Sequence, residues 1–147
     1  MKKTKLAIIG AGAAGCLAAL EASKNQNFEI TVFEKNKRIA RKLLITGKGR
    51  CNLTNNCSVE EFIPNVVSGG KFLYSALNRF PPAKTMEYFN DLGLELKTER
   101  GRRVFPVSDK AMDVKDALEK ELLKRDNVKI VFEKTIAIYK NEEVFTV

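Results

Sequence analysis

Three glycines near the start of the chain are spaced so that a phosphate group could approach the backbone. Residues 10–15 read GAGAAG and fit the pattern G-x-G-x-x-G. In this pattern Gly10 allows a tight turn out of a strand, Gly12 leaves room for a pyrophosphate, and Gly15 lets a helix pack closely on the strand. We therefore expect the whole turn to contact a dinucleotide: Gly10, Ala11, Gly12, Ala13, Ala14 and Gly15.

A single carboxylate, Glu34, follows the next apolar segment. The run FEITVF at residues 28–33 precedes it, and Glu34 lies 19 residues beyond Gly15. A carboxylate at the tip of the second strand can accept hydrogen bonds from both ribose hydroxyls of an adenosine, and it repels a 2′-phosphate. The position of Glu34 therefore indicates a ribose site and disfavours NADP.

A strand, a helix and a second strand must position these residues. The sequence predicts a strand over 5–9 (KLAII), a helix over 13–23 (AAGCLAALEAS) and a strand over 28–33. The first turn of that helix would offer free N–H groups and the positive end of its dipole to a phosphate. The unit from residue 5 to Glu34 has the usual βαβ size of about 30 residues, which makes the fingerprint more specific than its glycines alone.

The same N-terminal stretch also fits a short bacterial lipoprotein signal. Residues 1–5 are basic, residues 6–14 are apolar, and Cys16 follows small residues. The two interpretations exclude each other, because a signal would be removed from the mature protein. The second strand and Glu34 favour the nucleotide interpretation, in which Cys16 is a packing residue of the helix.

A second stretch, residues 41–55, also contains residue types that could bind a ligand, and it reads RKLLITGKGRCNLTN. It is not a P-loop, because G-x-x-x-x-G-K-[ST] would need Gly at position 42 and Ser or Thr at position 49, where Lys42 and Gly49 stand. Such a loop can wrap a diphosphate with backbone N–H groups and cationic side chains, and it can equally be an ordinary basic surface loop.

Composition narrows the classes of function. The net charge of +8 suits an anionic partner, such as a phosphate-bearing cofactor, nucleic acid or a membrane surface, and it equally suits a solvated surface covered by lysine. No RNA-recognition or zinc-finger signature accompanies it. The sequence has no His, and its three cysteines are not spaced C-x-x-C, so it predicts no metal site. With no apolar run of about 20 residues, we expect a soluble, cytoplasmic protein with reduced thiols and no membrane partner.

Four segments taken together resemble the BaiN-like family of FAD-dependent proteins, also described as aminoacetone-oxidase-like flavoproteins. They are IIGAGAAG, FEKNKRIARKLLITGKGRCNLTN, FLYSALNRF and GRRVFPVSDKAMDV, and RKLLITGKGRCNLTN is the most specific part. The resemblance implies FAD at the first site and a flavin-dependent oxidoreductase, with NAD(P)H and a small-molecule substrate as further partners of the full-length protein.

The same resemblance assigns further cofactor contacts. It implies Lys35 beside the ribose, Arg41 and Lys42 near the phosphates, Thr46, Gly47, Gly49, Arg50, Cys51 and Asn52 along the ribityl and flavin side, and Ile136 near the adenine. The family usually has a small residue at position 48, where this chain has Lys48. No catalytic acid or base is predicted. Cys51 is either a packing thiol or a thiol whose pKa is lowered by the neighbouring Arg50.

Family members are longer, so we expect residues 1–147 to be the N-terminal part of an FAD-binding domain, without the substrate domain and the C-terminal closing segment. Two other functions stay open: a nucleotide-binding or regulatory module without catalysis, and a basic nucleic-acid-binding protein. An apolar edge left exposed on the first strand would also favour self-association.

The expected fold is α/β, a partial Rossmann-like FAD/NAD(P)-binding domain with a parallel sheet in the order 3-2-1, a helical excursion and a small antiparallel β element. The sequence predicts helices over 71–79, 83–92 and 109–124, a hairpin of strands over 94–97 and 103–105, a third sheet strand over 128–132, and an antiparallel pair over 135–139 and 144–147.

Overall fold

A three-stranded parallel sheet carries the glycine turn and Glu34. The computed structural model describes residues 3–147, and β1 (Thr4–Ile9), β2 (Phe28–Phe33) and β6 (Val128–Val131) are hydrogen-bonded in the order β1-β2-β6. The register pairs Ile9 with Phe33 and Phe33 with Val131, so the carboxyl ends of the three strands meet at one edge. The predicted parallel sheet in the order 3-2-1 is confirmed.

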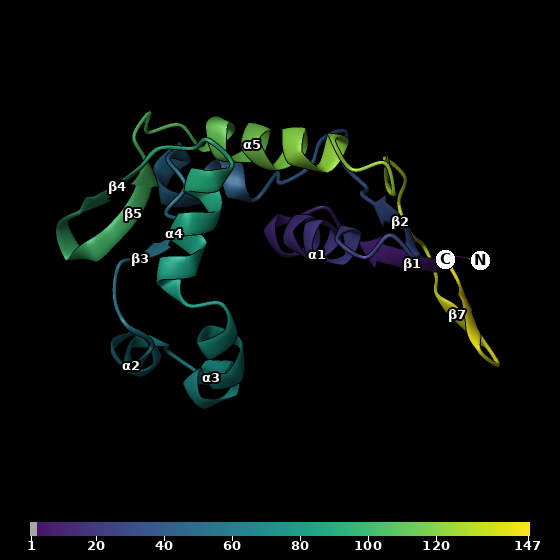
Figure 1. Ribbon diagram of the computed structural model, residues 1–147, viewed down its shortest axis with the longest axis horizontal. Helices are drawn as coiled ribbons and strands as arrows, with labels where there is room; N and C mark the ends of the chain where they lie inside the picture. Colours follow the sequence, from purple (N-terminus) through teal and green to yellow (C-terminus); the bar gives the residue numbers. More distant parts are fainter. Residues whose placement is uncertain (1–2) are drawn as a thin grey trace. The chain divides into compact units, whose positions relative to one another are not determined.

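The helix α1 (Ala13–Ser23) packs against β1 and β2 (Figure 1). Its sequence is rich in Ala and Leu, which favour helix formation. The buried residues are spaced i, i+3, i+4 and i+7, so they share one face of the helix; they are Cys16, Ala19, Leu20 and Ser23. Small side chains on this face let α1 approach the buried residues Ile30 and Val32 of β2 closely.

The chain forms two units, and this sheet belongs to the first, residues 3–43 with 118–147. The second unit, residues 44–117, contains a small antiparallel sheet in the order β3-β5-β4. Its strands are β3 (Thr54–Asn55), β4 (Leu96–Glu99) and β5 (Arg103–Pro106), and its helices are α2 (Val59–Phe62), α3 (Gly70–Arg79) and α4 (Pro82–Asp91). The helix α5 (Ala111–Leu123) begins in the second unit and ends in the first.

The predicted helices and the β4–β5 hairpin are present with ends shifted by one or two residues. The predicted antiparallel pair over 135–139 and 144–147 is present as β7 (Tyr139–Asn141) and β8 (Val144–Thr146), but its first strand begins at Tyr139 and not at residue 135. Ile136 and Ile138 are exposed, and no strand among the described residues pairs with 135–138, so β propensity alone does not make a strand there. None of the helices within residues 3–147 is long and apolar enough to cross a membrane.

A buried amide closes the first unit at the start of β6. The Asn127 side chain is 7% exposed, and its Nδ2 lies 3.1 Å from the carbonyl oxygen of Ser23 and 3.3 Å from those of Asn25 and Phe28. These three carbonyl groups belong to the connection between α1 and β2. Asn127 therefore joins that connection to β6, which pairs with β2.

We predict that Asn127→Ala lowers the free energy of unfolding by about 1–3 kcal/mol, because it removes a buried amide that donates to three carbonyl groups of the connection between α1 and β2. The matched control is Asp126→Ala, which changes the adjacent exposed residue and should cost less than about 0.5 kcal/mol. Urea unfolding followed by circular dichroism measures both. Equal stability of the two variants would contradict the role given to Asn127.

Candidate functional site

The glycine turn is shaped by one steric contact and one open surface. A Cβ atom on Gly15 would lie 1.9 Å from the carbonyl oxygen of Gly10, so only glycine allows α1 to begin this close to the end of β1. A Cβ atom on Gly10 or Gly12 would meet no atom of the described residues within 4 Å. Gly10 has φ +94°, which an L side chain rarely adopts. The turn therefore has room for a ligand on its outer side.

The N-terminal end of α1 offers donors without competing acids. Its first helical hydrogen bond runs from the N–H of Cys16 to the carbonyl oxygen of Gly12, at 2.9 Å. The N–H groups of Ala13, Ala14 and Gly15 come before that bond, and no acidic residue lies in the first turn. Gly12, Ala13 and Ala14 are exposed. This end of the helix can therefore receive an anion such as a phosphate.

Glu34 lies at the tip of β2 and is hydrogen-bonded directly to the glycine turn. Its Oε2 accepts the N–H of Ala11 at 2.9 Å, and its Oε1 accepts the N–H and the Nδ2 of Asn36 at 2.8 and 2.5 Å. Burial by itself would raise the pKa of Glu34, which is only 7% exposed, but the hydrogen bonds from Asn36 and Ala11 outweigh it and the pKa is lowered. The carboxylate is therefore ionised at neutral pH.

This arrangement limits what Glu34 can still bind. A carboxylate has about four acceptor positions, and protein donors occupy three of them. The remaining position is on Oε2, so Glu34 as it stands can accept one further hydrogen bond. Two ribose hydroxyls could bind only if Asn36 gave up one of its contacts. Sequence reasoning did not identify Asn36, because an asparagine in a polar loop carries no distinguishing signal in a single sequence.

Ala11 is the residue around which the turn is organised. It is fully buried, and its carbonyl oxygen accepts the N–H of Ala40 at 2.7 Å and the Sγ–H of Cys16 at 3.4 Å. Ala40 has φ +54°, and the segment after β2 thereby returns to the glycine turn. Cys16 is fully buried on α1, so the predicted packing role of this thiol is confirmed. Burial, with the charges of Glu34 and Glu119, raises its pKa to about 11.

Two of the basic residues predicted near the cofactor, Arg41 and Lys35, interact with Glu34, one through Asn36 and the other through its charge. The Nη1 of Arg41 donates to the Oδ1 of Asn36 at 2.9 Å, so Arg41 is linked through Asn36 to Glu34. Lys35 adds its charge to the groups that lower the pKa of Glu34. Lys42 is exposed, and Ile136 is 89% exposed between β6 and β7.

The remaining predicted residues form a loop in the second unit with several left-handed backbone conformations. Gly47, Lys48, Gly49 and Cys51 have φ values of +54°, +58°, +84° and +60°. A Cβ atom on Gly47 would lie 2.9 Å from the Asn52 nitrogen and 3.1 Å from the ring of Phe105. The φ of +58° at Lys48 is uncommon for a residue other than glycine, and it falls at the position where the family usually has a small residue.

Arg50 holds this loop against the β4–β5 hairpin. Its Nε donates to Asp109 Oδ1 at 2.8 Å, its Nη2 lies 2.5 Å from Glu99 Oε1, and its guanidinium lies 4.0 Å from the centroid of the Phe105 ring. Lys97 joins the same group through Asp109 Oδ2 at 2.6 Å. Arg50 is thus committed to two carboxylates and an aromatic ring within its own unit.

The suggestion that Arg50 lowers the pKa of Cys51 is wrong. Burial raises the pKa of this thiol, and only a hydrogen bond with Thr46 works in the opposite direction. The Cys51 side chain is 5% exposed, so its thiol is buried in this structure. In the part of the chain that the structure describes, no three His, Cys, Asp or Glu side chains cluster as metal ligands would.

A βαβ unit with a G-x-G-x-x-G turn, and a carboxylate bonded to that turn from the second strand, is the arrangement of a Rossmann-type domain. The chain belongs to the family described as the HI0933-like protein Rossmann domain, whose profile matches residues 4–147. This match confirms the resemblance to BaiN-like flavoproteins.

Curated relatives are similar over most of this chain. A 3-dehydro-bile acid delta(4,6)-reductase of Clostridium scindens is 38% identical over 129 residues, which is 86% of this chain and 30% of the relative. A ribosomal RNA dihydrouridine synthase of Escherichia coli is 28% identical over 146 residues, which is 99% of this chain and 36% of the relative. The chain thus spans about a third of the length of these relatives.

A solved structure has the same fold at low sequence identity. The THI4 protein of Thermovibrio ammonificans superposes with a TM-score of 0.58 at 11% identity, covering 98% of this chain and 45% of that chain.

We predict different effects for the same substitution at two glycines of the turn. Gly15→Ala should lower the free energy of unfolding by at least about 2 kcal/mol, because its methyl group would collide with the Gly10 carbonyl group. Gly12→Ala should leave stability unchanged within about 1 kcal/mol, because Gly12 has extended backbone angles and open space. Denaturant unfolding measures both, and a stable Gly15→Ala variant would contradict the packing.

A second prediction concerns acid. Hydrogen bonds from Arg50 and Lys97 lower the pKa values of Glu99 and Asp109. Their contribution to stability is therefore complete above the ordinary carboxyl pKa and is lost as pH falls through the lowered values. The stability difference between wild type and Arg50→Gln should accordingly be largest at neutral pH and shrink as the pH falls below the ordinary carboxyl range.

The control for this pH dependence is Arg103→Gln. Arg103 also lies over Phe105, at 5.7 Å, but it forms no ion pair among the described residues. Urea unfolding across the pH range should give Arg103→Gln the wild-type pH dependence. If both variants show the same profile, the Arg50 network does not produce the effect.

Proposed function

We propose that this chain binds FAD and forms the cofactor-binding part of a flavin-dependent oxidoreductase. The hydrogen bond from the Ala11 N–H to Glu34 Oε2 at 2.9 Å supports this most directly. It connects the turn suited to a pyrophosphate with the carboxylate suited to a ribose. Groups that the protein itself holds in position lose less entropy when a ligand binds.

In the first unit, each group has a role that its surroundings allow. The backbone N–H groups of Gly12 to Gly15 would face the pyrophosphate, and the open space above Gly10 and Gly12 fits such a group. Glu34 would accept one ribose hydroxyl at its free position on Oε2. Arg41, held by Asn36, would place its charge toward a phosphate, with Lys35 and Lys42 adding positive charge. Ile136 is proposed near the adenine.

In the second unit, we assign the flavin side to the loop from Thr46 to Asn52. The loop residues proposed as contacts are Thr46, Gly47, Gly49, Arg50, Cys51 and Asn52. Consecutive left-handed residues turn backbone N–H groups toward one side, which suits an anionic or carbonyl-bearing group. Because Arg50 is bound to Glu99 and Asp109, its contribution would be to hold the loop in shape rather than to pair with a phosphate.

We further propose that the reaction is the saturation of a carbon–carbon double bond. The names of the two relatives, a delta(4,6)-reductase and a dihydrouridine synthase, both describe products that gain hydrogen. FAD, when bound, supplies two-electron redox chemistry. The double bond would gain two electrons and two protons overall, with NAD(P)H as the proposed electron source.

The test measures binding of FAD and of FMN, which lacks the adenosine. Glu34→Gln should weaken FAD binding about 10- to 100-fold, the value of a charge-assisted hydrogen bond, and leave FMN binding unchanged. Gly12→Ala should weaken FAD binding without loss of stability. Glu29→Gln, the same change at an exposed position of β2, is the control. Quenching of flavin fluorescence reports affinity, and absence of FAD binding by the wild-type chain would refute the proposal.

A second candidate, RNA binding, is favoured by the net charge of +8 together with the name of the E. coli relative. It predicts that a uridine-containing oligonucleotide binds at low salt and that its affinity falls linearly with salt on a log–log plot. Filter binding at several salt concentrations tests it. Absence of binding at low salt would remove RNA as a partner of this chain.

A further inference from the structure

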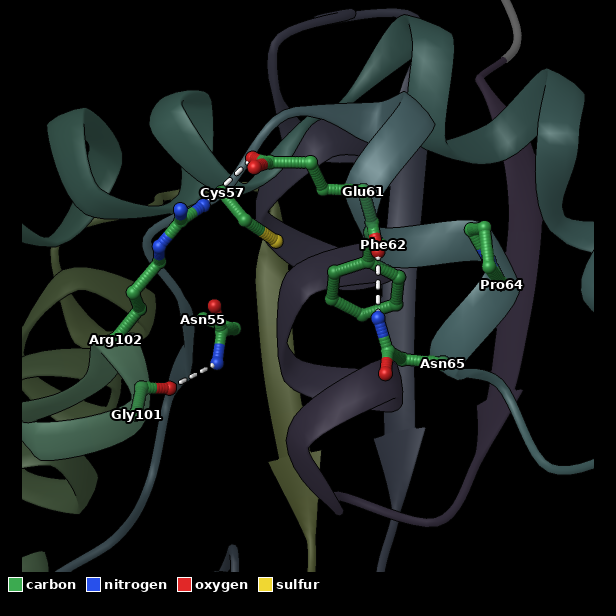
Figure 2. A pocket seen from close by; sticks show the side chains of 8 residues that line it. All are labelled: Asn55, Cys57, Glu61, Phe62, Pro64, Asn65, Gly101 and Arg102. Atoms are coloured by element: carbon green, nitrogen blue, oxygen red, sulfur yellow. Dashed lines mark hydrogen bonds and ion pairs between the residues drawn. The ribbon is translucent and has the colours of Figure 1, made fainter.

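A cavity of about 720 Å³ lies within the second unit, and no residue assigned to the cofactor lines it. Figure 2 shows that its side chains come from β3, from the segment around α2 and from the turn between β4 and β5. A volume of this size is in the range of small-molecule sites. The cavity is therefore large enough for a ligand of its own.

Two apolar side chains and one ion pair determine what could bind. Phe62 and Pro64 supply apolar surface, and Asn55 is held in place by its Nδ2, which donates to the Gly101 carbonyl oxygen at 2.8 Å. Opposite charges meet at the rim, where Arg102 Nη1 lies 2.7 Å from Glu61 Oε2 (Figure 2). A ligand for this cavity would combine an apolar body with a charged end.

The backbone places the Arg102 side chain at this rim under strain. Arg102 has φ +58°, directly after Gly101 with φ +75°. A left-handed conformation is uncommon for a non-glycine residue, and such positions concentrate at ligand sites. The turn between β4 and β5 therefore fixes an arginine at a position that a glycine would occupy more easily.

The ion pair can open without leaving a charge unsatisfied. The side chains of Arg102 and Glu61 are 58% and 50% exposed, so water can solvate both when they separate. Glu61 also accepts the N–H of Ser58 at 3.0 Å in the capping box of α2 and would keep that bond. An incoming anion could thus replace Glu61 as the partner of Arg102.

The turn that carries Arg102 is basic, whereas the acids of the neighbouring α2, Glu60 and Glu61, lie in its first turn. Arg100 and Arg103 flank the same turn and are exposed. Neither forms an ion pair within residues 3–147, since Glu99 is bound by Arg50 and Lys97. Arginine binds a carboxylate through two parallel hydrogen bonds, which an ammonium group cannot do.

We propose that this cavity binds a small carboxylate with an apolar body. The body lies against Phe62 and Pro64, and the carboxylate displaces Glu61 from the guanidinium of Arg102. None of the residues that line this cavity is assigned to FAD, so this proposal and the proposed function are tested by separate experiments.

The experiment titrates the ¹⁵N-labelled chain with 4-phenylbutyrate and follows amide chemical shifts. Saturable shifts should be confined to residues 55–65 and 100–102. Arg102→Gln should weaken binding by about fivefold, whereas Arg100→Gln, the same change two residues away, should alter it by less than about twofold. The uncharged analogue 4-phenylbutanamide should bind more weakly than the carboxylate.

The Glu61→Gln variant distinguishes two roles of the Arg102–Glu61 ion pair: a contact that a carboxylate ligand replaces, and a contact that only supports the structure. It removes the competing charge, and glutamine also serves in a capping box, so α2 should be retained. Displacement predicts that Glu61→Gln binds phenylbutyrate about threefold more tightly. Weaker binding by Glu61→Gln, equal effects of Arg102→Gln and Arg100→Gln, or shifts outside the named residues would each overturn the proposal. If Arg102→Gln fails to fold, the Glu61→Gln and phenylbutanamide results decide.

Discussion

The first unit depends on one buried contact, the hydrogen bond between the Ala11 N–H and the carboxylate of Glu34. Glu34 is ionised and almost fully buried, which is costly unless the charge is satisfied by donors. The donors come from the glycine turn and from Asn36, so the charge can be buried only when β1, β2 and the segment after β2 are in register. The same contact that stabilises the turn also orients the carboxylate.

The second unit uses a different device, a cation placed between acids and an aromatic ring. Arg50 lies over Phe105 and contacts Glu99 and Asp109, which belong to distant parts of the sequence. Gly47 packs on the same ring, so the loop from Thr46 to Asn52 is shaped around one buried phenylalanine. The sequence of this basic loop suggests a ligand site, but its Arg50 side chain forms contacts within the second unit that hold the loop in place.

The elements of the sheet could be predicted because their signals are local. The apolar runs, the glycine spacing and the carboxylate at the tip of β2 lie within 34 residues, and the structure places them as expected. The antiparallel pair near the end of the chain is present, but its first strand begins at Tyr139 and not at residue 135, because a strand extends only where it has a partner, which a local pattern does not supply. β3 escaped prediction for the opposite reason, since its two residues become a strand only by pairing with β5.

The site residues divide in the same way. The glycine turn and Glu34 are recognisable from spacing, whereas Asn36 and Ala40 act through hydrogen bonds that only the folded chain reveals. For Arg50 and Cys51, adjacency in sequence was misleading. The arginine turns to the hairpin and the thiol turns inward, so neighbouring residues enter different environments.

The division into units also has a consequence for how the chain folds. The first unit is discontinuous, since β2 and β6 pair although Ile30 and Val128 are far apart in sequence, whereas the second unit is one uninterrupted segment of residues 44–117. Ordering that segment first would shorten the flexible chain between the two strands and reduce the entropy lost when they meet. The inserted segment would then act as a spacer that brings β6 to β2, and the speed of sheet formation would be set by residues outside the sheet.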